Sequence, residues 1–338
     1  MRLVTYLLRS TWFVWSSAAT YFRPGPRRDS FLSLYGPLSL LIPIGVWVAG
    51  LIAAFGIISW GASLDPVHGV LNHLYLSGIT FFTVGYGDLT PKTPWAKIVA
   101  VVEAGTGLAF LGTVIGHLPV LYQLFSRREI QVIMLDPRAG SPPTATALLT
   151  RHAHGESTAR LQVLLHEWES WFALVLESHL SYPMLSYYRS QHDNESWIAG
   201  LAAIMDTCVL ILVGLREVST FQARVTFAAA RLALVEVSRA LSLSPDVHAE
   251  SRLTSTEFNN LKTELVAAGL AFTDEENAED RLAEFRATYE PFLAGSRIIC
   301  LCTCLAGIAP KLQLDNWQAS PAGRSAKQLV ESAPVNPS

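Results

Sequence analysis

Two long apolar stretches near the N-terminus dominate the pattern of hydrophobic and polar residues. Residues 38–60 contain no charged side chain, and residues 98–125 contain only Glu103 and His117 among acidic and basic residues. At a rise of about 1.5 Å per residue, a helix of either length crosses the roughly 30 Å hydrocarbon core of a membrane. The apolar stretch 70–82 between them is too short to cross, which predicts a re-entrant helix that stops at mid-depth.

Residues 4–22 also follow a helical period, with apolar and aromatic side chains on one arc and Arg9 on the other. A basic amphipathic helix of this kind is typical of the membrane interface. The proline- and arginine-rich segment 23–28 ends this helix and turns the chain toward the first span.

The composition changes beyond residue 128. Residues 130–135 form a β-prone run, and the turn-rich segment 136–143 predicts a linker. Helical patterns follow, without the glycine-rich fingerprint of a nucleotide-binding ring. They cover residues 145–180, 197–217, 222–241, 255–269 and 275–293.

The stretch 197–215 is apolar over a length that spans a membrane, but Asp206 lies at its centre. Because a charge in the middle of a span is costly, we interpret it as the buried central helix of a bundle, with a third span as the alternative.

These patterns predict an all-α membrane protein of four parts. They are an N-terminal interfacial helix and linker (1–29), a two-helix pore module (30–128), a helical cytoplasmic regulatory domain (129–316) and a disordered tail (317–338). The first residues lack the pattern of a cleavable signal peptide, so we expect the first span to direct insertion.

The segment after the pore helix, residues 83–88, reads TVGYGD. A dehydrated cation needs a column of oxygen atoms, and successive carbonyl groups point to one axis only if the backbone alternates between left- and right-handed conformations. Gly85 and Gly87 allow this alternation without a steric clash. TVGYG is the sequence of potassium-channel selectivity filters, whose carbonyl oxygens replace the hydration shell of K⁺.

The side chains of this segment have separate roles in that interpretation. Thr83 adds a hydroxyl as the innermost ion ligand, Val84 and Tyr86 turn outward to pack, and Asp88 places negative charge at the mouth. Potassium therefore binds at Thr83, Val84, Gly85 and Tyr86, and no cofactor is expected.

Basic residues predict the orientation, because they accumulate on the cytoplasmic side of membrane proteins. The only lysine or arginine in the loop 61–95 is Lys92, whereas arginines flank the two spans. They are Arg2, Arg9, Arg23, Arg27, Arg28, Arg127 and Arg128. We expect both termini in the cytoplasm and the protein in the inner (plasma) membrane.

The order of span, pore helix, TVGYGD and span resembles the two-transmembrane-helix potassium channels of bacteria, over about residues 30–128. The resemblance implies a homotetramer with one central pore, because one chain supplies only a quarter of each ring of oxygens. It also implies that Tyr75 braces Asp88 from behind the filter. Gly107 is implied as a gating hinge in the inner helix, with Gly112 and Gly116 as rivals. Leu108, Leu111 and Ile115 then face the aqueous cavity, and Pro119 lies near the inner bundle crossing.

One position departs from this family. Many members have a carboxylate behind the filter where this chain has Ile79, whereas Glu103 lies within the inner helix. Intramembrane carboxylates are costly enough to require a role. Glu103 either accepts hydrogen bonds from the pore helix, faces the cavity, or reaches water at the outer leaflet.

Composition limits the function further. Half of the residues are hydrophobic and 16 % are charged, and the net charge of −3 gives no indication of nucleic-acid binding. No set of nucleophile, base and oxyanion donors appears, so we expect no enzyme. The leading interpretation is a potassium-selective channel in contact with lipid, with an unknown ligand for its cytoplasmic domain. A weakly selective cation channel and a membrane-anchored scaffold with a vestigial pore are the alternatives.

Overall fold

In a computed structural model of the chain, the described residues are 2–23, 25–63, 69–153, 157–190, 196–215, 218–248, 252–272 and 277–300. The predicted tail at 317–338 lies outside them. The chain divides into two compact units, residues 1–124 and 125–338. Within the described residues every regular element is a helix, which confirms the all-α prediction, and one isolated β-bridge pairs Leu215 with Phe272.

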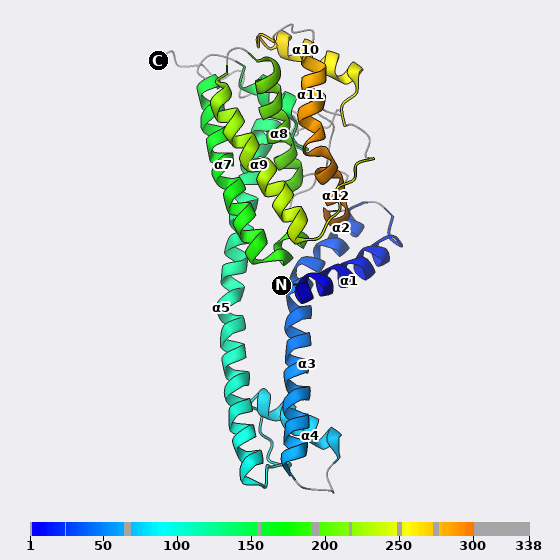
Figure 1. Ribbon diagram of the computed structural model, residues 1–338, viewed down its shortest axis with the longest axis vertical. Coiled ribbons are helices and arrows are strands. Elements are labelled where there is room, and N and C mark those ends of the chain that lie inside the picture. The colour runs from blue at the N-terminus through cyan, green and yellow to red at the C-terminus, as the bar shows by residue number, and fades with distance from the viewer. Residues whose placement is uncertain are drawn as a thin grey trace, which may run out of the picture. The chain divides into compact units, whose positions relative to one another are not determined.

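The first unit contains the membrane segments expected from the sequence (Figure 1). Its helices are α1 (Arg2–Ala19), α2 (Pro26–Ser33), α3 (Tyr35–Ser63), α4 (Val70–Phe81) and the first part of α5 (Pro94–Ala139). α3 and α5 contain the two predicted spans, and α4 is the predicted short helix between them. α2 was not predicted: proline at the first turn of a helix sacrifices no hydrogen bond, so the Pro-Arg-Arg segment also begins a helix.

Aromatic side chains hold α1 against α2 and the start of α3. The rings of Trp15 and Phe31 stack with centroids 4.4 Å apart, and the hydroxyl of Tyr35 donates to the carbonyl of Leu8 at 2.7 Å. On the other side of α1, Tyr6 and Phe13 remain exposed. An exposed aromatic face on a basic helix agrees with the expectation of a helix at the membrane interface.

The second unit is a bundle in which α7, α8 and α9 lie side by side (Figure 1). Its elements after α5 are α6 (Ala145–Arg151), α7 (Ser157–Ser181), the 3₁₀ helix η1 (Pro183–Tyr187), α8 (Trp197–Gly214), α9 (Thr220–Ala240), α10 (Ser255–Ala267), α11 (Ala278–Ala287) and α12 (Glu290–Cys300). The predicted helices 145–180 and 275–293 are each divided in two. The helix predicted at 275–293 is interrupted between α11 and α12, where the buried hydroxyl of Tyr289 donates a hydrogen bond to Asp206.

α8 is the central helix of this bundle. All of its residues except Leu212 are buried, against neighbours that include α6, α9 and α11. Its one carboxylate, Asp206, accepts a hydrogen bond from the hydroxyl of Tyr289 and forms an ion pair with Arg252 at 3.1 Å. The charge that argued against a membrane span is therefore matched inside the bundle, as the buried-helix interpretation requires.

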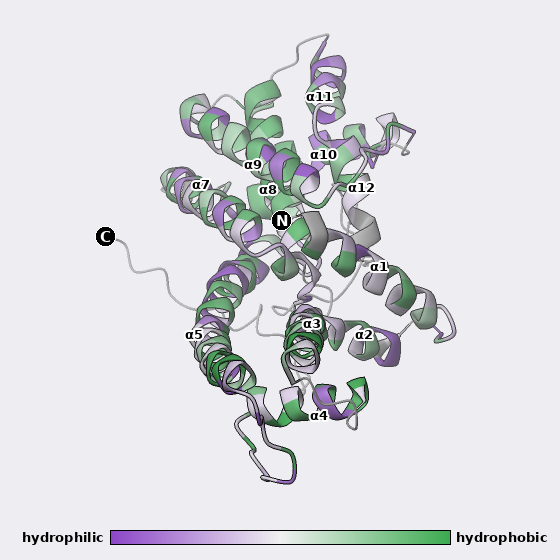
Figure 2. Ribbon diagram, turned by 60° about the horizontal axis from the view of Figure 1, so that its bottom comes forward, coloured by the Kyte–Doolittle hydropathy of each residue, from purple (hydrophilic) through white to green (hydrophobic). Residues whose placement is uncertain are grey.

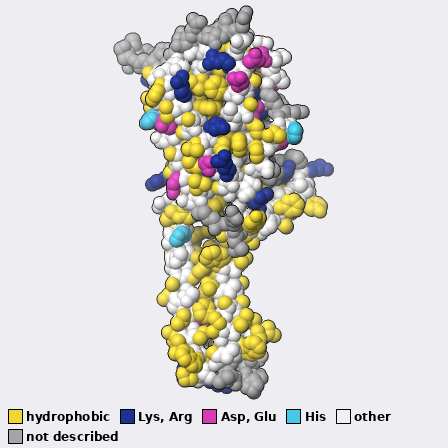
Figure 3. Space-filling model, viewed as in Figure 1, with side chains coloured by type: hydrophobic (Ala, Val, Ile, Leu, Met, Phe, Trp, Pro, Cys, Tyr) yellow, Lys and Arg dark blue, Asp and Glu magenta, His cyan; other side chains and the backbone are white. Residues whose placement is uncertain are grey.

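Three described helical stretches are long and apolar enough to cross a membrane: Arg27–Ala62, Pro94–Ala139 and Trp197–Gly214. In the first two only 11 % of the apolar window is buried, whereas in the third 94 % is buried. Figure 2 shows α3 and α8 as strongly hydrophobic helices and α7 and α11 with hydrophilic faces. In Figure 3, hydrophobic side chains cover the visible face of α3–α5, while charged side chains gather on the helical bundle.

The predicted β-run at 130–135 is wrong, and the predicted linker at 136–143 is shortened to its second half, because α5 continues to Ala139 and residues 140–143 form the turn before α6. Val132, Leu135 and Ala139 follow a helical spacing and are all buried in the second unit, so the bundle stabilises a helix over a locally β-prone sequence. α5 ends at Gly140, whose φ of 81° is left-handed and whose N–H donates to the carbonyl of Asp136 at 2.8 Å.

Candidate functional site

The segment after α4 has an alternating backbone. Thr83, Gly85 and Gly87 have left-handed φ angles of 54°, 58° and 80°, and the intervening Val84 and Tyr86 do not. The sequence predicts this alternation at the two glycines. Thr83 was not expected to be left-handed, since such a conformation disfavours a residue with a branched Cβ. Every second residue of the segment therefore has the same backbone hand, and only two of the three are glycine.

The end of α4 holds this segment through one carbonyl group. The N–H groups of Val84 and Gly85 both donate to the carbonyl oxygen of Ile79, at 2.8 and 3.3 Å. The N–H group of Thr83 donates to the carbonyl oxygen of Thr80 at 3.0 Å. Ile79, where the resembling family has a carboxylate, thus supports the segment through its backbone, while its side chain is buried.

Two glycines allow α4 to lie unusually close to α3 and α5. A Cβ at Gly56 of α3 would lie 2.8 Å from Cδ2 of Leu74 and 3.1 Å from its Cα. A Cβ at Gly107 of α5 would lie 2.1 Å from the carbonyl oxygen of Phe81, the last residue of α4. The predicted hinge residue Gly107 is therefore a packing position, whereas Gly112 and Gly116 have open space around them.

Glu103 lies one turn before Gly107 and is 2 % exposed. Its carboxyl group is hydrogen-bonded to the hydroxyl of Ser77 on α4. This observation selects the interpretation in which Glu103 bonds to the pore helix, and it excludes exposure to water at the outer leaflet.

Tyr75 and Asp88 lie together at the outer end of the segment, and their side chains are hydrogen-bonded. Beside them is a cavity of about 130 Å³. Its polar lining includes Ser59, Asn72, His73, Asp88, Thr90 and Lys92. The structure thus brings Tyr75 to the partner that the resemblance implies.

The inner-helix residues expected at the cavity share an exposed arc of α5. Leu108, Leu111 and Ile115 are 65 %, 54 % and 59 % exposed, so neither α3 nor α4 covers them. Pro119 lies inside α5, and the helix continues past it to Ala139. An apolar arc beside the filter segment is available for a water-filled cavity or for packing between chains.

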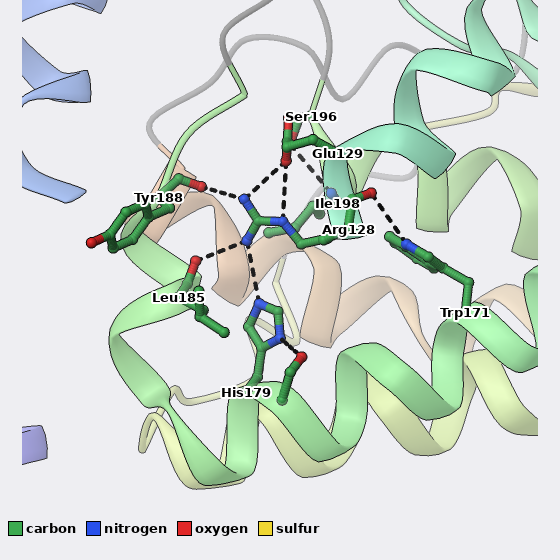
Figure 4. A network of polar contacts seen from close by, with 9 residues as sticks. Arg128, Glu129, Trp171, His179, Leu185, Tyr188, Ser196 and Ile198 are labelled. Atoms are coloured by element: carbon green, nitrogen blue, oxygen red, sulfur yellow. Dashed lines mark hydrogen bonds and ion pairs between the residues drawn. The ribbon is translucent and has the colours of Figure 1, made fainter. Parts of the chain in front are cut away.

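A second polar cluster, missed in the sequence, surrounds Arg128 in the second unit (Figure 4). Arg128 was counted among the arginines that flank the two spans, and it is 2 % exposed. Its guanidinium group pairs with Glu129 at 3.0 Å and donates to the carbonyls of Leu185 and Tyr188 at 2.8 and 2.7 Å. Trp171 in turn donates to the carbonyl of Arg128 at 3.2 Å. The bonds run from α5 to α7 and to the segment around η1.

His179 completes this cluster. Its Nδ1 lies 2.8 Å from the carbonyl of Val175 and its Nε2 lies 3.4 Å from Arg128. Burial, together with the positive charge of Arg128, lowers the pKa of His179 to about 3. The imidazole is therefore neutral, with Nδ1 as the donor and Nε2 facing the guanidinium as an acceptor.

Comparisons with known proteins point to the alternating segment after α4 and to the helices around it. Residues 46–121, which include α4, the alternating segment and most of α3 and of the first part of α5, match a family described as ion channels. Residues 46–121 form an ion-channel pore domain. The match covers the pore domain and not the helical bundle, so it establishes a membrane protein without assigning a function to residues 125–338.

Curated relatives extend this finding. The chain is 24 % identical over 198 residues to the uncharacterized membrane protein YdjJ of Bacillus subtilis, covering 55 % of this chain and 56 % of the relative. It is 50 % identical over 44 residues to two-pore potassium channel 5 of Arabidopsis thaliana, covering 13 % of this chain and 11 % of the relative. It is also 28 % identical over 93 residues to a voltage-gated potassium channel of Aeropyrum pernix, covering 28 % and 30 %.

The pore domain is thus related to those of potassium channels. The chain spans about half or less of the length of these relatives. The likeness to YdjJ covers more residues than the pore domain contains, so it continues beyond that domain. No solved structure matches the chain significantly.

Proposed function

We propose that this chain is one subunit of a homotetrameric, potassium-selective channel. The observation that carries the proposal is the alternating backbone of residues 83–87, because this conformation aims successive carbonyl groups to one side. Four copies then form stacked oxygen rings at Thr83, Val84, Gly85 and Tyr86, with Gly87 and Asp88 at the mouth. The ion crosses passively, and the pore needs no cofactor.

The exposed arc of α5 fits the same proposal. In a tetramer, Leu108, Leu111 and Ile115 line the cavity below the filter, and the region around Pro119 forms the inner crossing. The remaining exposed apolar surface of α3 contacts lipid, in a plasma membrane with both termini on the cytoplasmic side.

We propose in addition that the helical bundle biases the gate. α5 carries the inner-helix residues and, further along the same helix, Arg128, whose bonds fasten it to α7 and η1. A rearrangement of the bundle therefore acts on the inner helix directly. Coupling between sites commonly amounts to about 1–3 kcal/mol, or five- to 150-fold in an equilibrium.

The experiment that tests the channel is ion flux into liposomes containing the purified protein. We expect K⁺ uptake well above Na⁺ uptake for the full chain. Residues 1–124, which form one compact unit, are the comparison once cross-linking has shown that they assemble. We expect this truncation to keep the preference for K⁺ while its open probability changes by about five- to 150-fold.

Other outcomes assign the alternatives. Equal K⁺ and Na⁺ flux identifies a weakly selective cation channel. No flux from an assembled, correctly inserted protein indicates a membrane-anchored scaffold. A truncation with unchanged open probability removes the regulatory role of the bundle and leaves the pore assignment intact.

A further inference from the structure

The hydroxyl of Ser77 lies between two acceptors. Its Oγ is 2.8 Å from the carbonyl oxygen of Ile52 on α3 and is also bonded to Oε1 of Glu103 on α5. Ser77 is fully buried, so water does not supply a further partner. A serine hydroxyl has one proton to donate and can accept two hydrogen bonds.

Counting protons decides the direction of these bonds. The carbonyl of Ile52 and an ionised carboxylate can both only accept, so with Glu103 ionised the single proton of Ser77 could serve only one of the two contacts. A neutral Glu103 supplies a second proton, and both contacts are then hydrogen bonds. We infer that Glu103 is a neutral carboxylic acid that donates to Ser77, which donates in turn to the carbonyl of Ile52.

The surroundings of Glu103 agree with a neutral group. The helices packed against it, α3 and α4, contain no lysine, arginine, aspartate or glutamate, and the one titratable imidazole, His73, is bonded to Ser59 at 3.2 Å. On α5 itself the other acidic or basic residues of the first unit are Lys97 and His117, which are more than a turn away along the helix. A buried carboxylate with no compensating cation is strongly unfavourable.

This chain of two bonds joins the three helices at the level where they approach most closely. Ile52 lies one turn before Gly56 on α3, and Glu103 lies one turn before Gly107 on α5. Ser77 lies one turn before Phe81, which leads into the filter segment. Glu103 is therefore a positioning residue for the filter, and this consequence rests on the proposed function.

Infrared spectroscopy of the full-length protein in lipid vesicles at neutral pH tests the inference. The wild-type minus Glu103→Gln difference spectrum should contain the carbonyl band of a protonated carboxylic acid. The bands of the other carboxyl groups are the same in both proteins and cancel in the difference spectrum. If the difference instead shows the bands of an ionised carboxylate, Glu103 is charged and the inference is wrong.

Variants of Ser77 provide a second test, which does not depend on whether the Glu103→Gln protein assembles. Ser77→Thr retains the hydroxyl and should leave the acid band in place. Ser77→Ala removes the acceptor and should shift the acid band to the frequency of a carboxyl group without a bonded partner. Ser39→Ala is the matched control, since Ser39 is equally buried but bonds only the carbonyl of Gly36 in its own helix. An identical acid band in Ser77→Ala and wild type would overturn the inferred bond.

Ion flux separates this inference from the proposed function. Glu103→Gln keeps a donor of the same shape and should conduct K⁺ with a filter as long-lived as the wild type, whereas Glu103→Leu should shorten its conductive lifetime several-fold. Equal lifetimes for these two variants would remove the positioning role. An acid band in a protein that does not conduct leaves the bond in place and rejects only the channel.

Discussion

Gly107 lies directly against the carbonyl oxygen of Phe81, where a Cβ would come within 2.1 Å of that oxygen. The inner helix therefore meets the end of the pore helix at the residue from which the filter segment departs. The glycine that the family resemblance marks as a hinge has a second reason to be glycine, which is close packing.

Gly107→Ala should consequently destabilise the assembly. Backbone cannot move aside as a flexible side chain does, so we expect a cost of about 1–3 kcal/mol and a lower melting temperature of the protein. Gly112→Ala is the control, because its Cβ would meet nothing within 4 Å. A normal melting temperature with altered gating in Gly107→Ala would instead favour the hinge.

Gly85→Ala should abolish selectivity for K⁺ or all current. A Cβ at Gly85 has free space, but the φ of 58° is costly for alanine, by about 1–2 kcal/mol. The loss would therefore come from a change of backbone conformation that turns a carbonyl away. Reversal potentials in mixed K⁺ and Na⁺ measure it, with Gly45→Ala on α3 as a control in open space. An unchanged preference for K⁺ would contradict the filter assignment.

Tyr75→Phe should leave assembly intact and change how long the filter stays conductive. The substitution removes only the hydroxyl bonded to Asp88. Single-channel recordings give the open and inactivated lifetimes, and Tyr6→Phe on the exposed face of α1 is the matched control. Lifetimes equal to those of the wild type would show that the bond does not brace the filter.

Arg128→Met should destabilise the helical bundle by about 3–5 kcal/mol, because it leaves Glu129 buried without its cation. Arg128→Lys should restore little of this, since an ammonium group cannot serve Glu129 and two carbonyls in one plane. Thermal unfolding of the full chain measures the loss, and exposed Arg127→Met is the neighbouring control. Similar unfolding of the Arg128 and Arg127 variants would show that the cluster is not a structural anchor.

The stability of the bundle should decrease as the pH falls from about 6.5 toward 3. His179 has a pKa lowered to about 3 in the folded chain, so over this range the unfolded chain binds a proton that the folded chain does not. The slope from this group is at most about 1.4 kcal/mol per pH unit. His179→Gln should flatten the profile of melting temperature against pH, and exposed His166→Gln should not. Parallel profiles for both variants would exclude His179 as the cause.

Local sequence patterns predicted most of the pore domain. The spans, the short helix and the two left-handed glycines follow from apolar length and from the chemistry of a carbonyl column. For Glu103 the sequence left three environments open, of which the pore helix was one, and it could not identify Ser77 as the partner because no spacing rule relates residues 77 and 103 across two helices.

The second unit was harder to predict because its features depend on tertiary contacts. Residues 130–135 have β propensity, yet the burial of Val132 and Leu135 makes them helical. Arg128 served only as a charge that sets the orientation, since nothing nearby in the sequence indicates that the carbonyls of residues 185 and 188 surround it.

α5 continues from Pro94 to Ala139 without a break, and this limits the insertions and deletions that the helix can accept. Each residue added to a helix rotates everything beyond it by about 100°. A single insertion between residues 129 and 131 would rotate Arg128 by about 100° relative to Val132 and Leu135, so these three side chains could not all keep their buried positions in the bundle. We expect this part of α5 to accept substitutions at its exposed positions, such as Ile130, and almost no change in length.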